Sequence, residues 1–108
     1  MIDFERTIGF DWDSGNKRKS VDKHGVNQEE AEQVFFNLPL LLVEDIQHSQ
    51  AEQRIHALGK TKSGRLLHVT FTLRHHSTRI RVISARDMNR KERHVYGQKT
   101  QANPRLSE

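Results

Sequence analysis

Residues 65–74, RLLHVTFTLR, constrain the fold most strongly, because apolar and polar side chains alternate along them. One side of an extended chain would carry the apolar residues and the other the polar ones, namely Leu67, Val69, Phe71 and Leu73 against His68, Thr70, Thr72 and Arg74. This pattern is typical of a strand in an antiparallel sheet with one covered and one open face. The sequence therefore predicts an apolar face that carries the core and a polar face that bears histidine and arginine.

Strands are also predicted on both sides of this segment. Residues 54–59 and 79–86 are separated from it only by the turns KTKSG and HHST, and short connections join antiparallel neighbours. Within the later segment Arg81 falls on the face opposite Ile80 and Val82. Two further strands are expected, a short one over 10–12 and a largely buried one over 40–46.

Capping residues mark the first two expected helices. Asp13 or Ser14 is suited to begin a helix that runs to Gly25, which is a natural C-cap. Asn27, followed three residues later by Glu30, resembles a capping box that opens a second helix. The second helix carries an apolar stripe at helical spacing, formed by Ala31, Val34, Phe35 and Leu38.

A final short helix is expected to begin after Asn89, which has Glu92 at the third position, and to end near Gly97. The element order is then β-α-α-β-β-β-β-α. This order predicts an α+β fold in which the helices pack on one face of an antiparallel sheet. A chain of 108 residues forms one domain, expected over residues 1–97, and the aperiodic residues 98–108 are expected to be a mobile tail.

The charges of the chain are segregated along the sequence. Residues 1–59 hold six basic and 11 acidic side chains, a net of −5, and residues 60–108 hold 12 and three, a net of +9, which together give +4. A basic half is the electrostatic pattern expected of a phosphate-binding surface, because Lys and Arg displace the counterions of nucleic acid. The alternatives are a solvated basic surface or one that docks an acidic protein.

Several classes of protein are disfavoured by composition. The chain has no cysteine, so disulfides and thiolate metal sites are excluded, and no HxxxH or HExxH motif or three-ligand set is evident among its seven histidines. We therefore expect neither a metal nor a cofactor. The longest apolar run, residues 38–43, is interrupted by Pro39 and is too short to span a membrane. Residues 1–4 do not resemble a signal peptide, so a soluble cytoplasmic protein is expected.

A set of motifs in a fixed order resembles the BrnT toxins of type II toxin–antitoxin systems. The motifs are FDWD, KHGV, EEA..VF, H...E.R, GRLL.V and IRVISAR.....ER..Y, between Phe10 and Tyr96. The resemblance implies a RelE-like fold and a metal-independent ribonuclease activity that stops translation. It also implies a BrnA-like antitoxin whose ribbon-helix-helix domain binds DNA, so that DNA is contacted only through the complex. The chain departs from the family pattern at Ser14, Asn16 and Ser20, all in the first expected helix.

Metal-free RNA cleavage needs a base for the 2′-hydroxyl, positive charge at the phosphorus and an acid for the leaving 5′-oxygen. The candidates for these catalytic roles are His24 as the base, Arg81 as the charge and Glu52 as an alternative base. His24 and Glu52 match motifs of the family. His24 could instead interact with the carbonyl end of a helix, and Glu52 could form an ordinary ion pair with Arg54.

Further residues are candidates for binding RNA, either at phosphate groups or by stacking on a base: Lys23, Arg54, Arg86, Arg93 and Tyr96. Structural alternatives exist for two of them, since Arg86 could pair with Asp87 or Glu92, and Tyr96 could anchor the last helix. His48 matches the family's loop histidine. A non-catalytic nucleic-acid-binding or co-repressor module, or an adaptor that docks an acidic chain, would use the same basic surface.

Overall fold

A computed structural model of the chain describes residues 9–12, 24–47, 53–74 and 78–102. The elements in chain order are β1 (Gly9–Phe10), α2 (Gln28–Phe36), β2 (Leu41–Asp45), β3 (Arg54–Lys60), β4 (Leu66–Arg74), β5 (Arg79–Asp87) and α3 (Arg90–Ala102). The first expected helix lies outside the described residues except at its end. There Gly25 has a φ of 65°, the left-handed conformation expected of a C-cap.

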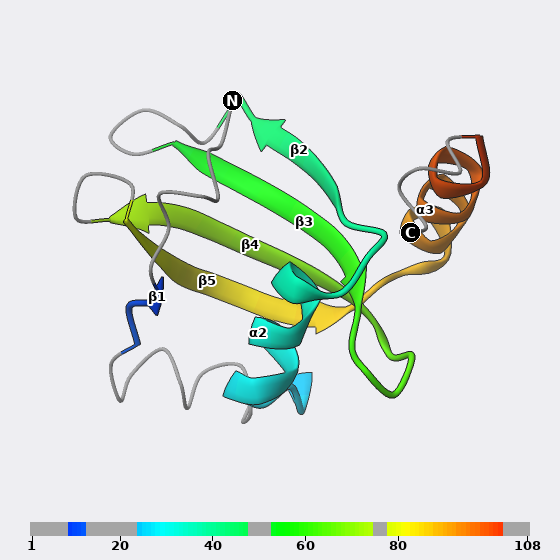
Figure 1. Cartoon of the computed structure of the whole chain (residues 1–108). Helices are drawn as coiled ribbons and strands as arrows, with labels where there is room; N and C mark the ends of the chain where they lie inside the picture. Colours follow the sequence, from blue (N-terminus) through cyan, green and yellow to red (C-terminus); the bar gives the residue numbers. More distant parts are fainter. Residues whose placement is uncertain (1–8, 13–23, 48–52, 75–77, 103–108) are drawn as a thin grey trace.

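The five strands form one sheet in the order β1-β5-β4-β3-β2 (Figure 1). The pairs β2–β3, β3–β4 and β4–β5 are antiparallel, as their short connections predict. The expectation of a wholly antiparallel sheet is wrong at one edge, because β1 runs parallel to β5. β1 pairs with a strand that is distant in sequence, so no short loop fixes its direction.

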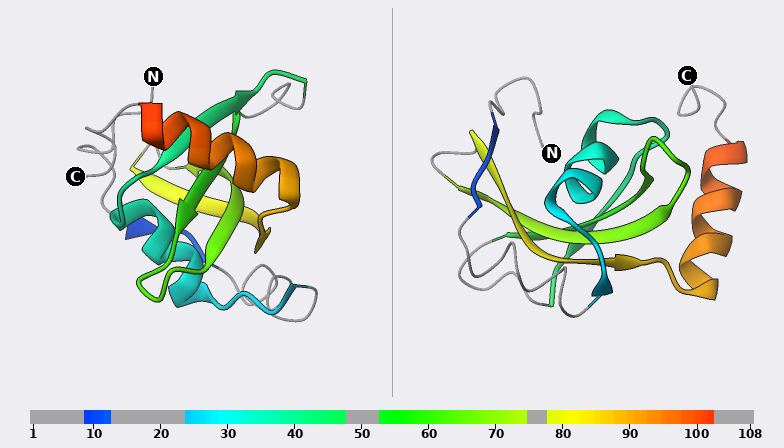
Figure 2. Two further views of the ribbon diagram at one scale, coloured as in Figure 1. Left: turned by 90° about the vertical axis from the view of Figure 1, so that its right-hand side faces the viewer. Right: turned by 90° about the horizontal axis from the view of Figure 1, so that it is seen from below.

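Helix α2 covers one face of the sheet and forms the main core with it (Figures 1 and 2). The capping box predicted at its start is present, since the Asn27 side chain accepts from the Glu30 amide and the Glu30 side chain accepts from the Asn27 amide. Gly59 lets the helix approach closely, because a Cβ at that position would lie 2.7 Å from Val34 Cγ1. The covered face holds the apolar residues of the alternating strands, including Ile55, Ala57, Leu67, Val69, Phe71, Ile80, Val82 and Ala85.

Helix α3 stands at one end of the sheet (Figure 2). It packs there on Leu58 and Leu66, whose side chains alternate onto the face opposite α2. Its buried Tyr96 joins Leu58 and Met88 in a second core cluster, and the Tyr96 hydroxyl donates to the Pro39 carbonyl at 2.5 Å. This placement corrects the expectation that the helices share one face. The short connection makes the helix begin at the end of β5. Tyr96 and Met88 then bury the apolar side chain of Leu58, which the register places on the open face.

The last helix is also longer than its sequence predicts. It continues through Gly97 to Ala102 instead of ending at the glycine, and the Thr100 hydroxyl donates to the Tyr96 carbonyl at 2.6 Å. Gly97 is not among the glycines with positive φ, so it does not terminate the helix. Residues 98–102, assigned to the tail by their sequence, are therefore helical, and residues 103–108 lie outside the described part of the chain.

Candidate RNA-binding face and its polar row

The face of the sheet opposite α2 carries a connected set of polar side chains, here called the polar row. Its members come from four strands and from α3: Asp45, His56, His68, Thr70, Arg86 and Glu92. The strand register places His56 opposite Thr70, and His68 opposite Arg86. Directly opposed residues share a face, so the row crosses the sheet from β2 to β5.

His56 is fixed at both ring nitrogens. Its Nε2 lies 2.9 Å from Asp45 Oδ2, and its Nδ1 lies 2.9 Å from the Thr70 hydroxyl oxygen. A carboxylate that holds one nitrogen of an imidazole orients the ring for proton transfer, while a threonine hydroxyl can either donate or accept. The His56 side chain remains 28% exposed, although both of its ring nitrogens have a protein partner.

His68 packs beside His56, with ring centroids 4.8 Å apart. Burial lowers the pKa of His68, and the charges of Arg86 and His56 lower it further. The Glu92 carboxylate, 3.7 Å from Nε2, raises it but does not offset the effect of burial. The Nδ1 atom of His68 is buried and has no hydrogen-bond partner in the described structure. His68 is therefore a neutral imidazole at pH 7.

The lowered pKa of His68 predicts that the protein loses stability in mild acid. The unfolded chain takes up a proton below about pH 6.5, whereas the folded chain resists it, so the free energy of unfolding falls as the pH drops from 7 to 5. His68→Gln removes the titrating imidazole, so the free energy of unfolding should fall less between pH 7 and pH 5. Urea denaturation at both pH values measures the effect, and an equally steep decline in the variant would contradict it.

Arg86 and Glu92 join β5 to the start of α3. Both guanidinium Nη atoms of Arg86 donate to the Glu92 carboxylate, each at 2.8 Å. Burial alone would raise the pKa of Glu92, but the hydrogen bonds from Arg86 and from the Asn89 backbone amide lower it. Glu92 and Asn89 also cap α3 reciprocally, as their sequence spacing predicts. The pairing of Arg86 with Glu92, one of the structural alternatives, is the arrangement observed.

Positive charge surrounds the polar row. Among the described residues, the alternation of side chains and the strand register place six basic and three acidic side chains on the open face. The basic ones are Arg54, Lys60, Arg74, Arg79, Arg81 and Arg86, and the acidic ones are Asp11, Asp45 and Glu92. Arg81 Nη1 is 3.6 Å from Asp11 Oδ2, so the two side chains form an ion pair on this face. The face therefore carries a net positive charge suited to a polyanion.

A second charged cluster lies at the end of β5 on the side that α2 covers. The guanidinium of Arg65 donates to the Asp87 carboxylate at 2.7 and 3.0 Å, to Glu30 at 3.0 Å and to the carbonyls of Gly25 and His24. The hydrogen bond from Arg65 lowers the pKa of Asp87. With its donors committed to protein groups, Arg65 ties the segment before α2 to the end of the sheet.

His24 and Arg81, proposed from the sequence as partners in catalysis, are not brought together. His24 lies beside Arg65 and Asp87, whereas Arg81 is six residues before Asp87 in the same strand and faces the open side. At about 3.3 Å per residue the six steps from Arg81 to Asp87 span about 20 Å of strand. The structure therefore places His24 and Arg81 in different parts of the described fold, and their catalytic roles stay predictions.

The structure places the other predicted site residues as follows. Arg54 lies opposite Asp45 on the open face, and Arg93 is exposed on α3 and donates to the Met88 carbonyl at 2.8 Å. Tyr96 is only 6% exposed, so its ring anchors α3 and is not presented for stacking on a base. Lys23, Glu52 and His48 lie outside the described residues.

The sequence interpretation missed Asp45 and His56 as members of a site. The signal was present for His56, because Arg54 and His56 alternate with the buried Ile55 and Ala57, as the polar residues of β4 do with theirs. Asp45 could be recognised only from the pairing of β2 with β3, which sets its position relative to His56.

Two further searches of the described residues bear on function. No group of three or more His, Cys, Asp or Glu side chains in these segments could hold a metal ion. Neither described helix is long and apolar enough to cross a membrane.

Comparisons with known proteins agree with this architecture. Residues 12–92 match the family model described as ribonuclease toxin, BrnT, of type II toxin-antitoxin system. The 1.1 Å crystal structure of the Brucella abortus ribonuclease toxin BrnT is similar in fold, with a TM-score of 0.60 and 21% sequence identity, over 78% of this chain and 100% of that one. No curated protein sequence matches the chain.

Proposed function

Since the chain belongs to the BrnT family of ribonuclease toxins of type II toxin–antitoxin systems, we propose that it is a metal-independent endoribonuclease that stops translation and is neutralised by a cognate antitoxin. The observation that carries the proposal is the polar row, an oriented imidazole within a positively charged sheet face. RNA is a polyanion, and its unpaired segments can lie across such a face.

The proposed chemistry uses groups of the chain alone. The 2′-oxygen of RNA attacks the adjacent phosphorus while the bond from phosphorus to the 5′-oxygen breaks. One proton leaves the 2′-hydroxyl and one is delivered to the 5′-oxygen. We assign proton transfer to Nδ1 of His56: Asp45 orients the ring through Nε2, and Nδ1 exchanges its contact with the Thr70 hydroxyl for the RNA, takes the proton of the 2′-hydroxyl and returns it to the 5′-oxygen. We assign phosphate binding to Arg81 and Arg54 on the same face.

The remaining members of the row have supporting roles. Arg86 is held by two hydrogen bonds to Glu92, so its charge stays fixed beside His68 at the end of the row. His68 is a neutral neighbour that packs on His56. The catalytic roles predicted for His24 and Glu52, and phosphate binding by Lys23 and Arg93, stay predictions, and the assays below test His24 directly.

We expect RNA affinity to fall steeply between about 50 and 200 mM salt, because each neutralised phosphate releases a counterion. Arg81→Ala should weaken binding and reduce the salt slope by about one. Titration of a labelled RNA at several salt concentrations measures both quantities. Lys62→Ala is the matched control, because Lys62 is an exposed cation beside α2 on the other side of the sheet. A flat affinity, or equal slopes for both variants, would contradict the proposed RNA face.

The activity is tested by incubating the purified chain with labelled RNA in EDTA. Fragments that accumulate with time are expected. RNA that is bound but stays intact would instead favour the non-catalytic binding module.

A further inference from the structure

Basic side chains continue on the open face beyond the polar row, toward the connection between β4 and β5. In the register of these strands Thr72 is paired with Arg81, and Arg74 is paired with Arg79 two residues farther on. Residues two apart in a strand point to the same face, so the positions of Arg79 and Arg81 lie side by side, about 7 Å apart. Arg74 and Arg79, here called the outer arginine pair, therefore add a second step of positive charge next to Arg81.

The two members of the outer arginine pair are directly opposite each other in neighbouring strands. Both are half-buried, and like charges that are opposed in this way repel each other and lower stability. Within the part of the chain that the structure describes, Arg79 forms no ion pair. A phosphate between the two guanidinium groups would relieve the repulsion and could accept hydrogen bonds from both.

Gly9 makes room for the Arg79 side chain on this face. The parallel register of β1 and β5 pairs Gly9 with Arg79, and a Cβ at Gly9 would lie 2.8 Å from Arg79 Nη1, so even the methyl group of alanine would displace the guanidinium. The next residue, Phe10, points to the other face, where its ring packs on that of Phe35 with centroids 5.6 Å apart. The Arg79 guanidinium therefore lies over the backbone of β1 on the open face.

The outer arginine pair continues a series of side chains that begins at His56. In β4 the partners of His56, Arg81 and Arg79 are residues 70, 72 and 74, so the three side chains follow one another at even steps along one face. An extended RNA strand can present successive phosphates at a similar spacing, and proteins bind such strands in basic grooves that follow the backbone. A strand with one phosphate at Arg81 can therefore place the next phosphate at the outer arginine pair.

We propose that the outer arginine pair is a second phosphate subsite, which binds the phosphate next to the one that is cleaved. The inference rests on the proposed ribonuclease function and names the substrate that the site prefers, an RNA strand with at least one phosphate beyond the scissile one. Arg74 and Arg79 bind that phosphate through charge-assisted hydrogen bonds. The contact determines which phosphate lies beside His56 and contributes to affinity, and it takes no part in the bond changes themselves.

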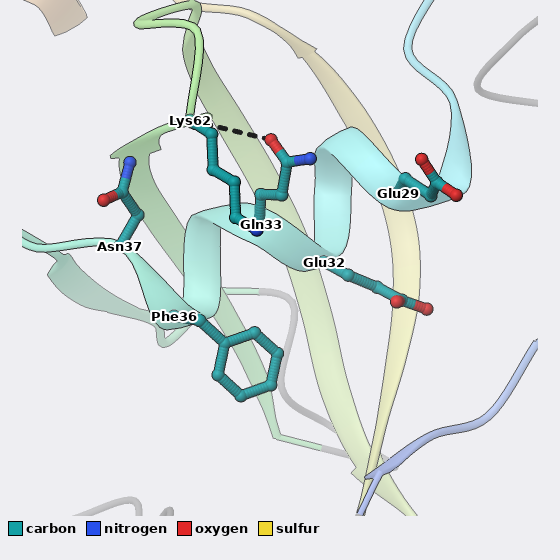
Figure 3. Close-up of a pocket in the computed structure, with 6 residues that line it drawn as sticks. All are labelled: Glu29, Glu32, Gln33, Phe36, Asn37 and Lys62. Carbon is teal, nitrogen blue, oxygen red and sulfur yellow. Dashed lines mark hydrogen bonds between the residues drawn. The ribbon is translucent and has the colours of Figure 1, made fainter.

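The test titrates the full chain with two 2′-O-methyl RNAs that cannot be cleaved, a dinucleotide with one phosphate and a trinucleotide with two. For the parental chain the second phosphate should raise the affinity about tenfold and steepen the salt slope by about 0.7. Arg79→Ala should lose both gains, and Gly9→Ala should reduce them because it displaces the guanidinium but keeps its charge. The matched control is Lys62→Ala, which removes a cation beside α2, where the Lys62 amide donates to Gln33 (Figure 3). It should keep both gains.

Circular dichroism verifies that each variant is folded. The inference would be overturned by a parental chain that binds both RNAs equally well, by an Arg79→Ala protein that keeps the gain, or by an equal loss in Lys62→Ala. Cleavage of unmodified RNA is measured separately. If RNA is cleaved and the gain does not depend on Arg79, the proposed activity stands without this subsite. If the gain depends on Arg79 and RNA stays intact, the proposed activity is rejected and the phosphate subsite stands.

Discussion

His56→Ala is expected to slow RNA cleavage by about 10²- to 10⁴-fold, the usual contribution of a positioned acid or base. The imidazole is fixed by Asp45 and Thr70, each at 2.9 Å, and no other histidine on the described open face retains as much exposure. RNA affinity should change little, because the arginines that bind phosphate remain. Single-turnover cleavage of a labelled RNA in EDTA, combined with a binding titration, separates the two effects.

The matched control for this variant is His94→Ala, which removes an exposed histidine from α3. It should cleave RNA at the parental rate. Asp45→Asn is a second probe, since it keeps the size of the side chain but removes the charge that orients His56. We expect it to lower the rate and to alter the pH profile without changing RNA affinity. A His56→Ala protein that cleaves as fast as His94→Ala would refute the assignment.

Phe71→Ala is expected to lower the free energy of unfolding by about 3–5 kcal/mol, as truncation of a buried aromatic residue usually does. Phe71 is fully buried at the centre of the covered face, and its ring meets that of Phe35 edge-on with centroids 4.9 Å apart. A loss of this size is a large fraction of the stability of a small domain. Urea denaturation followed by circular dichroism measures the change.

Phe36→Ala makes the same chemical change one residue after Phe35, at a ring that is 79% exposed. Among the described aromatic rings, this one meets only that of Phe10, edge-on with centroids 6.0 Å apart, so the loss should be about 0.5–1.5 kcal/mol, well below that of Phe71→Ala. Similar losses for the two variants would mean that the Phe36 ring is buried as fully as that of Phe71. That result would contradict the packing described above.

The covered and open faces of the sheet could be predicted because period-two alternation is a local property. Of the four apolar residues of β4 predicted to be covered, Leu67, Val69 and Phe71 are fully buried and Leu73 is half-buried. The starts of both described helices could also be predicted, since Asn27 and Asn89 each cap a helix with the glutamate three residues later. Such signals depend on neighbours within a few residues.

Features that depend on distant pairing could not be predicted in the same way. Three features join segments that are apart in the sequence. They are the parallel pairing of β1 with β5, the packing of α3 on the open face and the contact between Asp45 and His56. For the same reason His24, chosen by its motif, and Arg81, chosen by its place on the open strand face, were expected in one site, whereas the fold places them apart. The alternation in β3 predicts that His56 lies on the open face. That Asp45 is its partner follows only from the pairing of β2 with β3.

The central claim is that RNA is cleaved on the open face with His56 as the proton-transfer group. The most direct test compares cleavage of a labelled RNA in EDTA by the parental chain, His56→Ala and His24→Ala at pH 5 to 9. Cleavage by the parental chain and by His24→Ala, together with its loss in His56→Ala, is the predicted result. Loss of cleavage in His24→Ala, together with parental activity in His56→Ala, would contradict this claim. The general base would then be His24, in the segment before α2.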